Sequence, residues 1–228
     1  MAGFRNGVAA AFGGAMLFAA MSAHAVSVNW ASLTSDDPNA GTVTGTVQTS
    51  SGPVTAVYSG GDLFDQLNNT GTNYWSPPDF TQGVVNPPLT SDIIALSDAN
   101  TGTLTFSAPV TNVFMAFNSY NGAEVTFSSP FKIISQGCAY WGCGTFVPNA
   151  NNTGFYGNSE TVGVLEFLGT FTSISFTDTV TEDWHGFTFG VSPAPEAPTW
   201  VAMLLGFGLA GAGLRMARRK ARLSLSEA

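Results

Sequence analysis

The sequence predicts an all-β protein, and three observations support this prediction. Thr, Ser, Gly, Asn, Val and Phe dominate the middle of the chain. Short runs of β-branched and aromatic residues recur there, separated by turn-forming residues. No long stretch carries apolar residues at helical spacing, and no fixed repeat is visible. The pattern therefore favours one β-sandwich or jelly-roll-like ectodomain over residues 26–192.

The strands are expected where these runs occur along the chain. Apolar alternation is plainest at Leu104 and Phe106, and again at Ile174 and Phe176, where one face of each strand would enter the core. The expected strands cover residues 26–33, 42–49, 54–60, 92–98, 102–107, 110–119, 123–128, 131–135, 162–169, 172–179 and 186–192.

One long irregular region interrupts this series. Residues 60–92 contain several Pro, Gly and Asn residues between the third and fourth expected strands. A loop of this length inside a compact domain usually has a structure of its own. We expect it to pack Phe64, Trp75 and Phe80 over the sheet.

The N-terminal segment is typical of a secretory signal peptide. Residues 1–25 carry one charge, Arg5, followed by an apolar run from Val8 to Met21, and they close on Ala23-His24-Ala25. This small-x-small ending is the pattern at which signal peptidase cleaves. We expect removal after Ala25; the alternative is an ordinary first helix.

Residues 193–222 differ from everything before them. The 16 residues from Thr199 to Leu214 are uncharged and would span about 24 Å as a helix, against a bilayer core of roughly 30 Å. With Met216 and Ala217 included, we expect a single transmembrane helix over about residues 199–217. The positive-inside rule would keep the following basic cluster on the cytoplasmic side. This basic stop consists of Arg215, Arg218, Arg219, Lys220 and Arg222.

A short motif precedes the apolar segment, and with it the tail resembles a known sorting signal. Its residues are Pro195, Glu196, Pro198 and Trp200. Motif, Gly-rich apolar segment and basic tail together resemble the PEP-CTERM domain of exported proteins of Gram-negative bacteria, a tail also catalogued at the C-terminus of ice-binding proteins. The resemblance implies recognition by exosortase, a membrane protease-transpeptidase, and transfer to the outer surface or an extracellular matrix. Position 197 is Ala where the family has Pro, and the second Pro stands at 198.

The charge of the expected mature domain excludes one class of partner. Lys132 is the only Lys or Arg between residues 26 and 195, whereas 13 of the 15 acidic residues lie there, giving a net charge of about −12. Such a surface repels phosphates, so we expect no nucleic-acid binding. Residues 100–191 also resemble other exported proteins with this kind of tail, which implies a β-sandwich ectodomain but transfers no activity.

Cys138 and Cys143 are the only cysteines. In an oxidising, exported setting they are expected to form a disulfide that closes a tight loop, and two sulfurs without nearby histidines make a poor zinc site. The loop would present Tyr140 and Trp141 at its tip. Exposed aromatic rings on a β-sandwich can stack on sugars, so we expect four candidate ligand-binding residues. These are Trp75, Tyr140, Trp141 and Tyr156.

No pattern in the sequence predicts catalysis. His185 follows Glu182 and Asp183, and it could serve as a base or a metal ligand; the simpler interpretation packs Trp184 and His185 at the start of the last strand, with the carboxylates in solvent. No G-x-S-x-G motif is present, and no paired carboxylates stand out. We therefore expect neither catalytic nor metal-binding residues, although the groups at 35–39 and 97–100 could offer oxygen ligands to Ca²⁺.

These observations predict an exported, non-enzymatic protein of the bacterial surface or extracellular matrix. Its role would be structural or adhesive and linked to exopolysaccharide or biofilm. Its expected partners are signal peptidase and the export machinery, exosortase, the inner membrane as a transient anchor, and polysaccharide. The alternatives are a carbohydrate-binding module, a permanently membrane-anchored surface protein and, less favoured, a secreted hydrolase.

Overall fold

The structure is a computed structural model that describes residues 25–88 and 91–193, together with residues 204, 207–209, 211 and 215. The expected signal peptide lies outside the described residues, as do most of the expected transmembrane segment, the sorting motif (Pro195, Glu196, Pro198, Trp200) and the basic residues Arg218, Arg219, Lys220 and Arg222. Arg215 is described as helical and exposed. Within the described part of the chain, no helix combines the length and the apolar character that a bilayer crossing requires.

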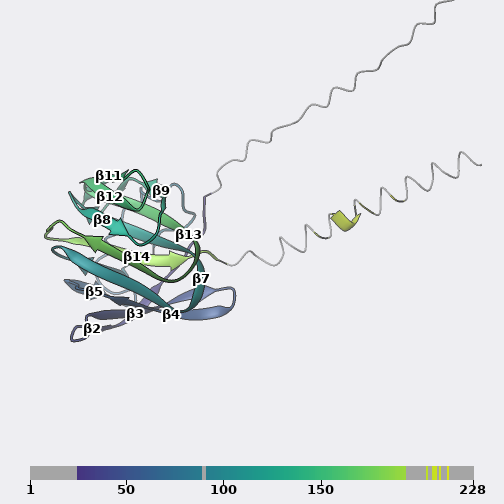
Figure 1. The fold of residues 1–228 in the computed structure, drawn as a ribbon, viewed down its shortest axis with the longest axis horizontal. Helices are drawn as coiled ribbons and strands as arrows, with labels where there is room; N and C mark the ends of the chain where they lie inside the picture. The colour runs from purple at the N-terminus through teal and green to yellow at the C-terminus, as the bar shows by residue number, and fades with distance from the viewer. Residues whose placement is uncertain are drawn as a thin grey trace, which may run out of the picture.

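The prediction of an all-β domain is confirmed. Fourteen strands join into one sheet, and all of their pairings are antiparallel (Figure 1). The strands are β1 (Asn29–Trp30), β2 (Ser32–Asp37), β3 (Thr42–Thr49), β4 (Gly52–Ser59), β5 (Phe64–Gln66), β6 (Ile93–Leu96), β7 (Asn100–Tyr120), β8 (Glu124–Phe127), β9 (Lys132–Gln136), β10 (Cys138–Ala139), β11 (Gly142–Pro148), β12 (Gly154–Ser159), β13 (Thr161–Asp178) and β14 (His185–Val191).

Two long strands, β7 and β13, fold this sheet onto itself. The first half of β7 pairs with β4 and with the second half of β13, whereas its second half pairs with β14 and with the first half of β13. One arm of the sheet therefore contains β2–β4, β8 and β10–β12, and the other contains β1, β5, β6, β9 and β14. Aromatic rings from the two arms meet in the core: the ring centroids of Tyr58 and Phe187 lie 5.3 Å apart.

The sequence predicted two strands at 102–107 and 110–119, but the structure has a single strand, β7, across both. Residues 107–109 pair with no neighbouring strand, so Pro109 interrupts no ladder hydrogen bond. The expected strands 162–169 and 172–179 are likewise continuous in β13, which has register shifts at this point. Bulges and unpaired segments of this kind let one strand pass from one arm to the other.

Four strands were missing from the sequence prediction. They are the short β5 and the group β10, β11 and β12. Residues 137–159 are rich in Gly and Asn, which are uncommon in strands, so their composition resembles a loop. Phe146 and Phe155 nevertheless turn inward from these strands and are 4% exposed each.

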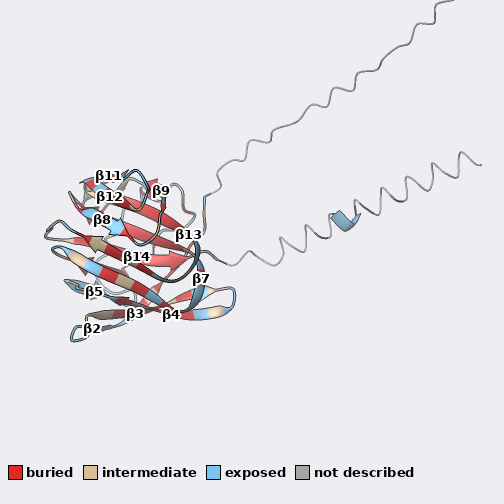
Figure 2. Cartoon of the chain, in the orientation of Figure 1, coloured by how far each residue is buried: buried red, intermediate tan, exposed pale blue. Residues whose placement is uncertain are grey.

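The core between the arms is largely aromatic. Phe117 lies at its centre, fully buried on β7, and β14 is buried along its whole length because both of its faces are covered (Figure 2). The rings within 6.4 Å of Phe117, measured between centroids, are those of Tyr120, Phe127, Phe146, Phe155 and Phe187.

The long segment between β5 and β6 covers the outer face of one arm, as expected for residues 60–92. Trp75 and Phe80 are 2% and 0% exposed and pack with residues such as Phe114 of β7 and Val164 of β13 in a second apolar cluster. Phe64 was expected in this cluster but belongs to β5 and stays 36% exposed.

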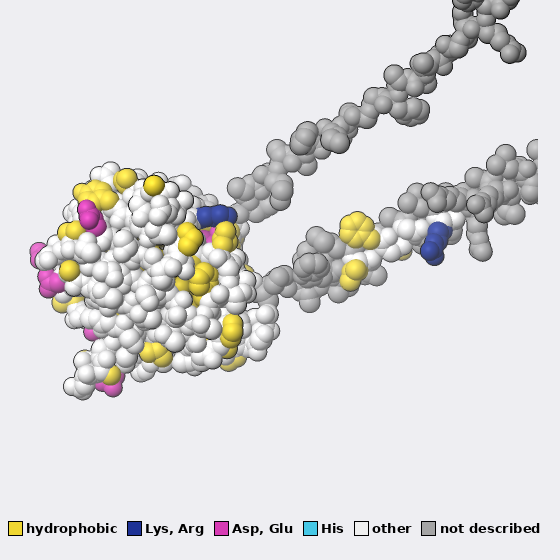
Figure 3. Space-filling model, in the orientation of Figure 1, with side chains coloured by type: hydrophobic (Ala, Val, Ile, Leu, Met, Phe, Trp, Pro, Cys, Tyr) yellow, Lys and Arg dark blue, Asp and Glu magenta, His cyan; other side chains and the backbone are white. Residues whose placement is uncertain are grey.

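The first and last strands of the domain lie side by side. Asn29 of β1 pairs with Val191 of β14, so the chain enters and leaves the sheet at neighbouring points. The acidic character predicted from the sequence is visible on the surface, where several Asp and Glu side chains gather at the left edge of the face shown in Figure 3.

Candidate functional site

The expected disulfide between Cys138 and Cys143 is confirmed. The two cysteines are directly opposite each other in the β10–β11 hairpin, and only four residues separate them in the sequence. Tyr140 and Trp141 form the turn, and Gly142 follows with a positive φ of 145°, a conformation that favours glycine. The disulfide thus fixes a very short loop with two aromatic residues at its tip.

The tip residues are exposed and belong to a larger aromatic cluster. Tyr140 and Trp141 are each 50% exposed. Behind them, the ring of Tyr74 lies 5.3 Å from Tyr140 and 6.2 Å from Trp141, and the ring of Trp184 lies 5.6 Å from Trp141. We call these four residues the aromatic tip. Because the partly buried rings support the exposed ones, binding would cost little side-chain freedom.

The other two candidate ligand-binding residues are not part of the aromatic tip. Trp75 is 2% exposed, and its indole N–H donates to the backbone carbonyl of Asp92 at 3.4 Å, so it offers no exposed ring to a ligand. The neighbouring Tyr74, which was not a predicted site residue, packs against Tyr140 and Trp141 instead. Tyr156 is 46% exposed as predicted, but it lies on β12 and lines a separate groove with Val147 and Glu124.

A pocket of about 290 Å³ opens beside the aromatic tip. Its polar part comes from three places: the end of β7, the turn before β13 and the loop before β14. The residues that line it are Ser119, Asn121, Trp141, Glu160, Glu182, Asp183 and Trp184.

Internal hydrogen bonds fix two of the pocket carboxylates. Glu160 accepts hydrogen bonds from the Ser119 hydroxyl and, at 3.0 Å, from the Asn121 side-chain amide. Glu182 accepts one from the Asn121 backbone N–H at 2.8 Å. The pocket therefore presents carboxylates in defined positions, which suits the recognition of hydroxyl or ammonium donors.

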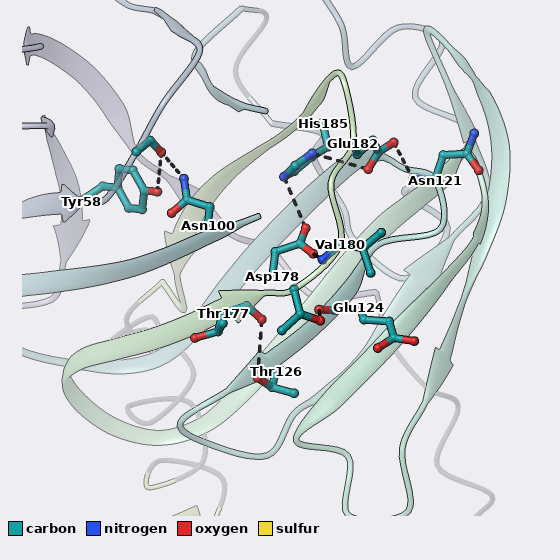
Figure 4. Close-up of polar contacts among 12 residues, drawn as sticks. Tyr58, Asn100, Asn121, Glu124, Thr126, Thr177, Asp178, Val180, Glu182 and His185 are labelled. Carbon is teal, nitrogen blue, oxygen red and sulfur yellow. Dashed lines mark hydrogen bonds and ion pairs between the residues drawn. The ribbon is translucent and has the colours of Figure 1, made fainter. Parts of the chain in front are cut away.

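Beneath the pocket, His185 connects Glu182 to a deeper carboxylate (Figure 4). The His185 side chain is completely buried; its Nδ1 lies 3.4 Å from Oε2 of Glu182, and its Nε2 lies 3.4 Å from Oδ2 of Asp178. Oδ1 of Asp178 accepts a hydrogen bond from the Val180 backbone N–H at 3.1 Å. We call Asp178, Glu182 and His185 the buried triad.

Burial sets the protonation of the buried triad. It raises the pKa of Glu182 to about 8 and that of Asp178 to about 6, and it lowers the pKa of His185 to about 4. At neutral pH, Glu182 therefore holds a proton, Asp178 is mostly ionised and His185 is neutral. The buried triad then carries one net negative charge.

The sequence prediction for this region was correct only in part. His185 packs at the start of the last strand, as expected, and Asp183 is exposed. Glu182 was expected in solvent, but its side chain is only 11% exposed because it turns inward to His185. Asp178 is 1% exposed for the same reason.

One group of described residues has the spacing of a metal site. Asp36, Asp62 and Asp65 each place a carboxylate oxygen within 4.8 Å of the others. Burial, reinforced by the charge of Asp62, raises the pKa of Asp65 to about 8. Three such oxygens could hold Ca²⁺. Of the two groups suggested from the sequence, only residues 35–39 contribute to this cluster, through Asp36.

Comparison of the chain with protein-family models, with characterised proteins and with solved structures finds no significant match. The functional interpretation therefore depends on the aromatic tip, the pocket and the charges around them. Tyr74, Asn121, Glu160 and Trp184 were not among the predicted site residues, because their convergence depends on the pairing of distant strands.

Proposed function

We propose that the chain is an exported protein of the bacterial surface or matrix, and that its β-domain binds polysaccharide without cleaving it. The observation that carries the binding role is the half-exposed pair Tyr140 and Trp141, held by a disulfide beside a pocket lined with hydrogen-bond acceptors. We class the folded-over sheet as a jelly-roll-like β-sandwich, since its two arms face each other across one core.

The chemistry of the site suits a sugar ring. A pyranose has an apolar face, which can stack on an aromatic ring, and an edge of hydroxyl groups, which need acceptors. Trp141 offers the ring, and Glu160 and Asp183 offer acceptor oxygens in the same pocket. Both kinds of contact can therefore be made to one sugar unit.

The carboxylates support binding rather than hydrolysis. A glycosidase needs one carboxyl group whose proton faces the glycosidic oxygen and a second that acts as base or nucleophile. Both oxygens of Glu160 accept internal hydrogen bonds, and Oε2 of Glu182 faces His185 away from the pocket. Neither residue directs a free acidic proton at a bound sugar.

Trp141→Ala is expected to weaken polysaccharide binding about tenfold or more, because exposed tryptophans beside pockets commonly dominate such interfaces. Binding of the purified protein to polysaccharides from the producing cells can be followed by calorimetry and by tryptophan fluorescence. Tyr156→Ala, in the separate groove, tests the remaining exposed candidate and should bind normally if the aromatic tip is the binding site. Equal binding by wild type and Trp141→Ala would contradict the proposal, and release of reducing ends would identify a hydrolase.

We also propose that the tail directs sorting by exosortase after export. The support is the resemblance of the segment from Pro195 to Arg222, together with the leader over residues 1–25. The protein recovered from the cell surface is expected to lack residues 1–25 and everything after about Glu196, as measured by intact mass. A product that retains Trp200–Ala228 would instead indicate a permanent anchor.

A further inference from the structure

The charges around the pocket discriminate between kinds of polysaccharide. Glu160, Asp183 and the protonated Glu182 line it, and none of its lining residues is Lys or Arg. Lys132, the only Lys or Arg of residues 25–193, lies on β9 opposite Glu166 of β13. No cation of this domain therefore neutralises the pocket, and an anionic sugar such as a uronic acid would be repelled.

The carboxylates remain available as acceptors. Each carboxylate oxygen can accept more than one hydrogen bond, so Glu160 retains capacity after bonding to Ser119 and Asn121. The side chain of Asp183 is exposed. An ammonium group has three donors and no acceptor, and it makes stronger hydrogen bonds to carboxylates than a hydroxyl does.

The two tryptophans of the pocket also favour a positively charged ligand. The rings of Trp141 and Trp184 lie 5.6 Å apart and are inclined at 59°, and both line the pocket with the carboxylates. A cation over a tryptophan face is attracted by the ring quadrupole, and tryptophan is the strongest of the aromatic residues in this respect. Carboxylates and indole rings in one pocket thus make the complement of an organic cation.

We propose that this pocket binds a protonated amino sugar, so that the preferred polysaccharide is a glucosamine-type polymer with free amino groups. The sugar ring stacks on Trp141, and its ammonium group lies between the indole rings and the carboxylates of Glu160 and Asp183. This inference rests on the proposed polysaccharide-binding function and specifies its ligand.

The test compares two ligands that differ only at the nitrogen: the disaccharide of glucosamine and the disaccharide of N-acetylglucosamine. Calorimetry with the purified full-length protein, at mildly acidic pH where the free amines are protonated, should show binding of the glucosamine disaccharide about tenfold tighter or more. A disaccharide is preferred to a polymer because long polycations bind any acidic surface through many weak contacts.

Matched variants separate the pocket from the overall negative charge. The double variant Glu160→Gln/Asp183→Asn is expected to lose the preference for the amine and to keep the binding of the acetylated ligand. Glu124→Gln removes one charge in the separate groove and should leave both affinities unchanged. Circular dichroism and thermal unfolding verify that each variant is folded.

The other possible results distinguish failure of the amino-sugar assignment from failure of the proposed polysaccharide binding. Equal affinity for the two disaccharides, an equal loss in the Glu124→Gln control, or tighter binding of a uronic acid disaccharide would overturn the amino-sugar assignment while leaving polysaccharide binding intact. If no ligand of this set and no polysaccharide from the producing cells binds in a Trp141-dependent manner, the proposed function itself fails.

Discussion

His185→Leu is expected to lower the free energy of unfolding by about 1–3 kcal/mol, the usual cost of leaving a buried polar group without its partner. In wild type, Nε2 of His185 lies 3.4 Å from Oδ2 of Asp178, which is 1% exposed. Leucine has no polar atom, so Oδ2 of Asp178 must remain charged beside an apolar side chain or take up a proton. Urea unfolding of both proteins at neutral pH gives the difference directly.

Two further variants show whether the cost comes from the orphaned carboxylate. In His185→Leu/Asp178→Leu, the group left without a partner is also gone, so stability should recover in part relative to the single variant. Asp178→Asn keeps the shape and the Val180 hydrogen bond and should cost less than His185→Leu. If the double variant is as unstable as the sum of two independent losses, loss of packing rather than charge dominates and the triad assignment is wrong.

The stability of the wild-type protein is expected to fall as pH rises from about 6.5 to about 8. In this range the unfolded chain has Glu182 ionised, whereas the folded protein, in which burial raises the pKa of Glu182 to about 8, retains the proton. The folded state binds more protons, so raising the pH favours unfolding. The part of the slope that comes from Glu182 should stay below about 1.4 kcal/mol per pH unit, the value for one whole proton.

Below pH 6.5, different groups change the stability in opposite directions as the pH rises. The lowered pKa of His185, about 4, makes stability rise with pH up to about 6.5, whereas the raised pKa of Asp178, about 6, acts in the opposite direction. The window from about 6.5 to about 8 is therefore where Glu182 is best observed. Asp65 has a similarly raised pKa, so the Glu182 contribution must be measured as a difference between variants.

Glu182→Gln provides this difference, because its amide can donate to Nδ1 of His185 at every pH. Its stability should change less between pH 6.5 and 8 than that of wild type, and Asp183→Asn, at the exposed neighbour, should behave like wild type.

Asp178→Asn adds an independent check: its amide would donate to Nε2, the histidine proton would move to Nδ1, and Glu182 could then ionise. A full slope in Glu182→Gln would exclude this residue as its source.

The strand pattern was readable from the sequence wherever alternation was strong, and the segment at 42–49 coincides with β3. The continuity of β7 through Pro109 could not be predicted, because a proline normally ends a strand. The proline is tolerated here because residues 107–109 pair with no neighbouring strand. The strands β10–β12 were not predicted because their Gly and Asn residues have low β-propensity. They form strands through pairing, which joins β12 to β8.

In the candidate site, too, the sequence predicted the residues that are close in the chain and missed those that strand pairing brings together. Cys138, Tyr140, Trp141 and Cys143 are close in sequence, so their spacing sufficed to predict the disulfide-closed loop and its two exposed aromatic residues. The other members come from residues 74, 121, 160 and 184, which only the folded sheet brings together. Trp75 illustrates the limit: neighbouring aromatic residues face opposite ways, and the sequence alone does not show which one is buried.

The pairing of β1 with β14 has a consequence for a chain that crosses a membrane from its N-terminus. The sheet cannot be completed until residue 191 has crossed the membrane, because β1 pairs with β14, the last strand. The longest ladder, between β7 and β13, also joins segments about 60 residues apart, and distant pairings of this kind form slowly. Such a chain would stay largely unstructured during translocation and fold only after nearly all of the domain had arrived, with its edges open to chaperones in the meantime.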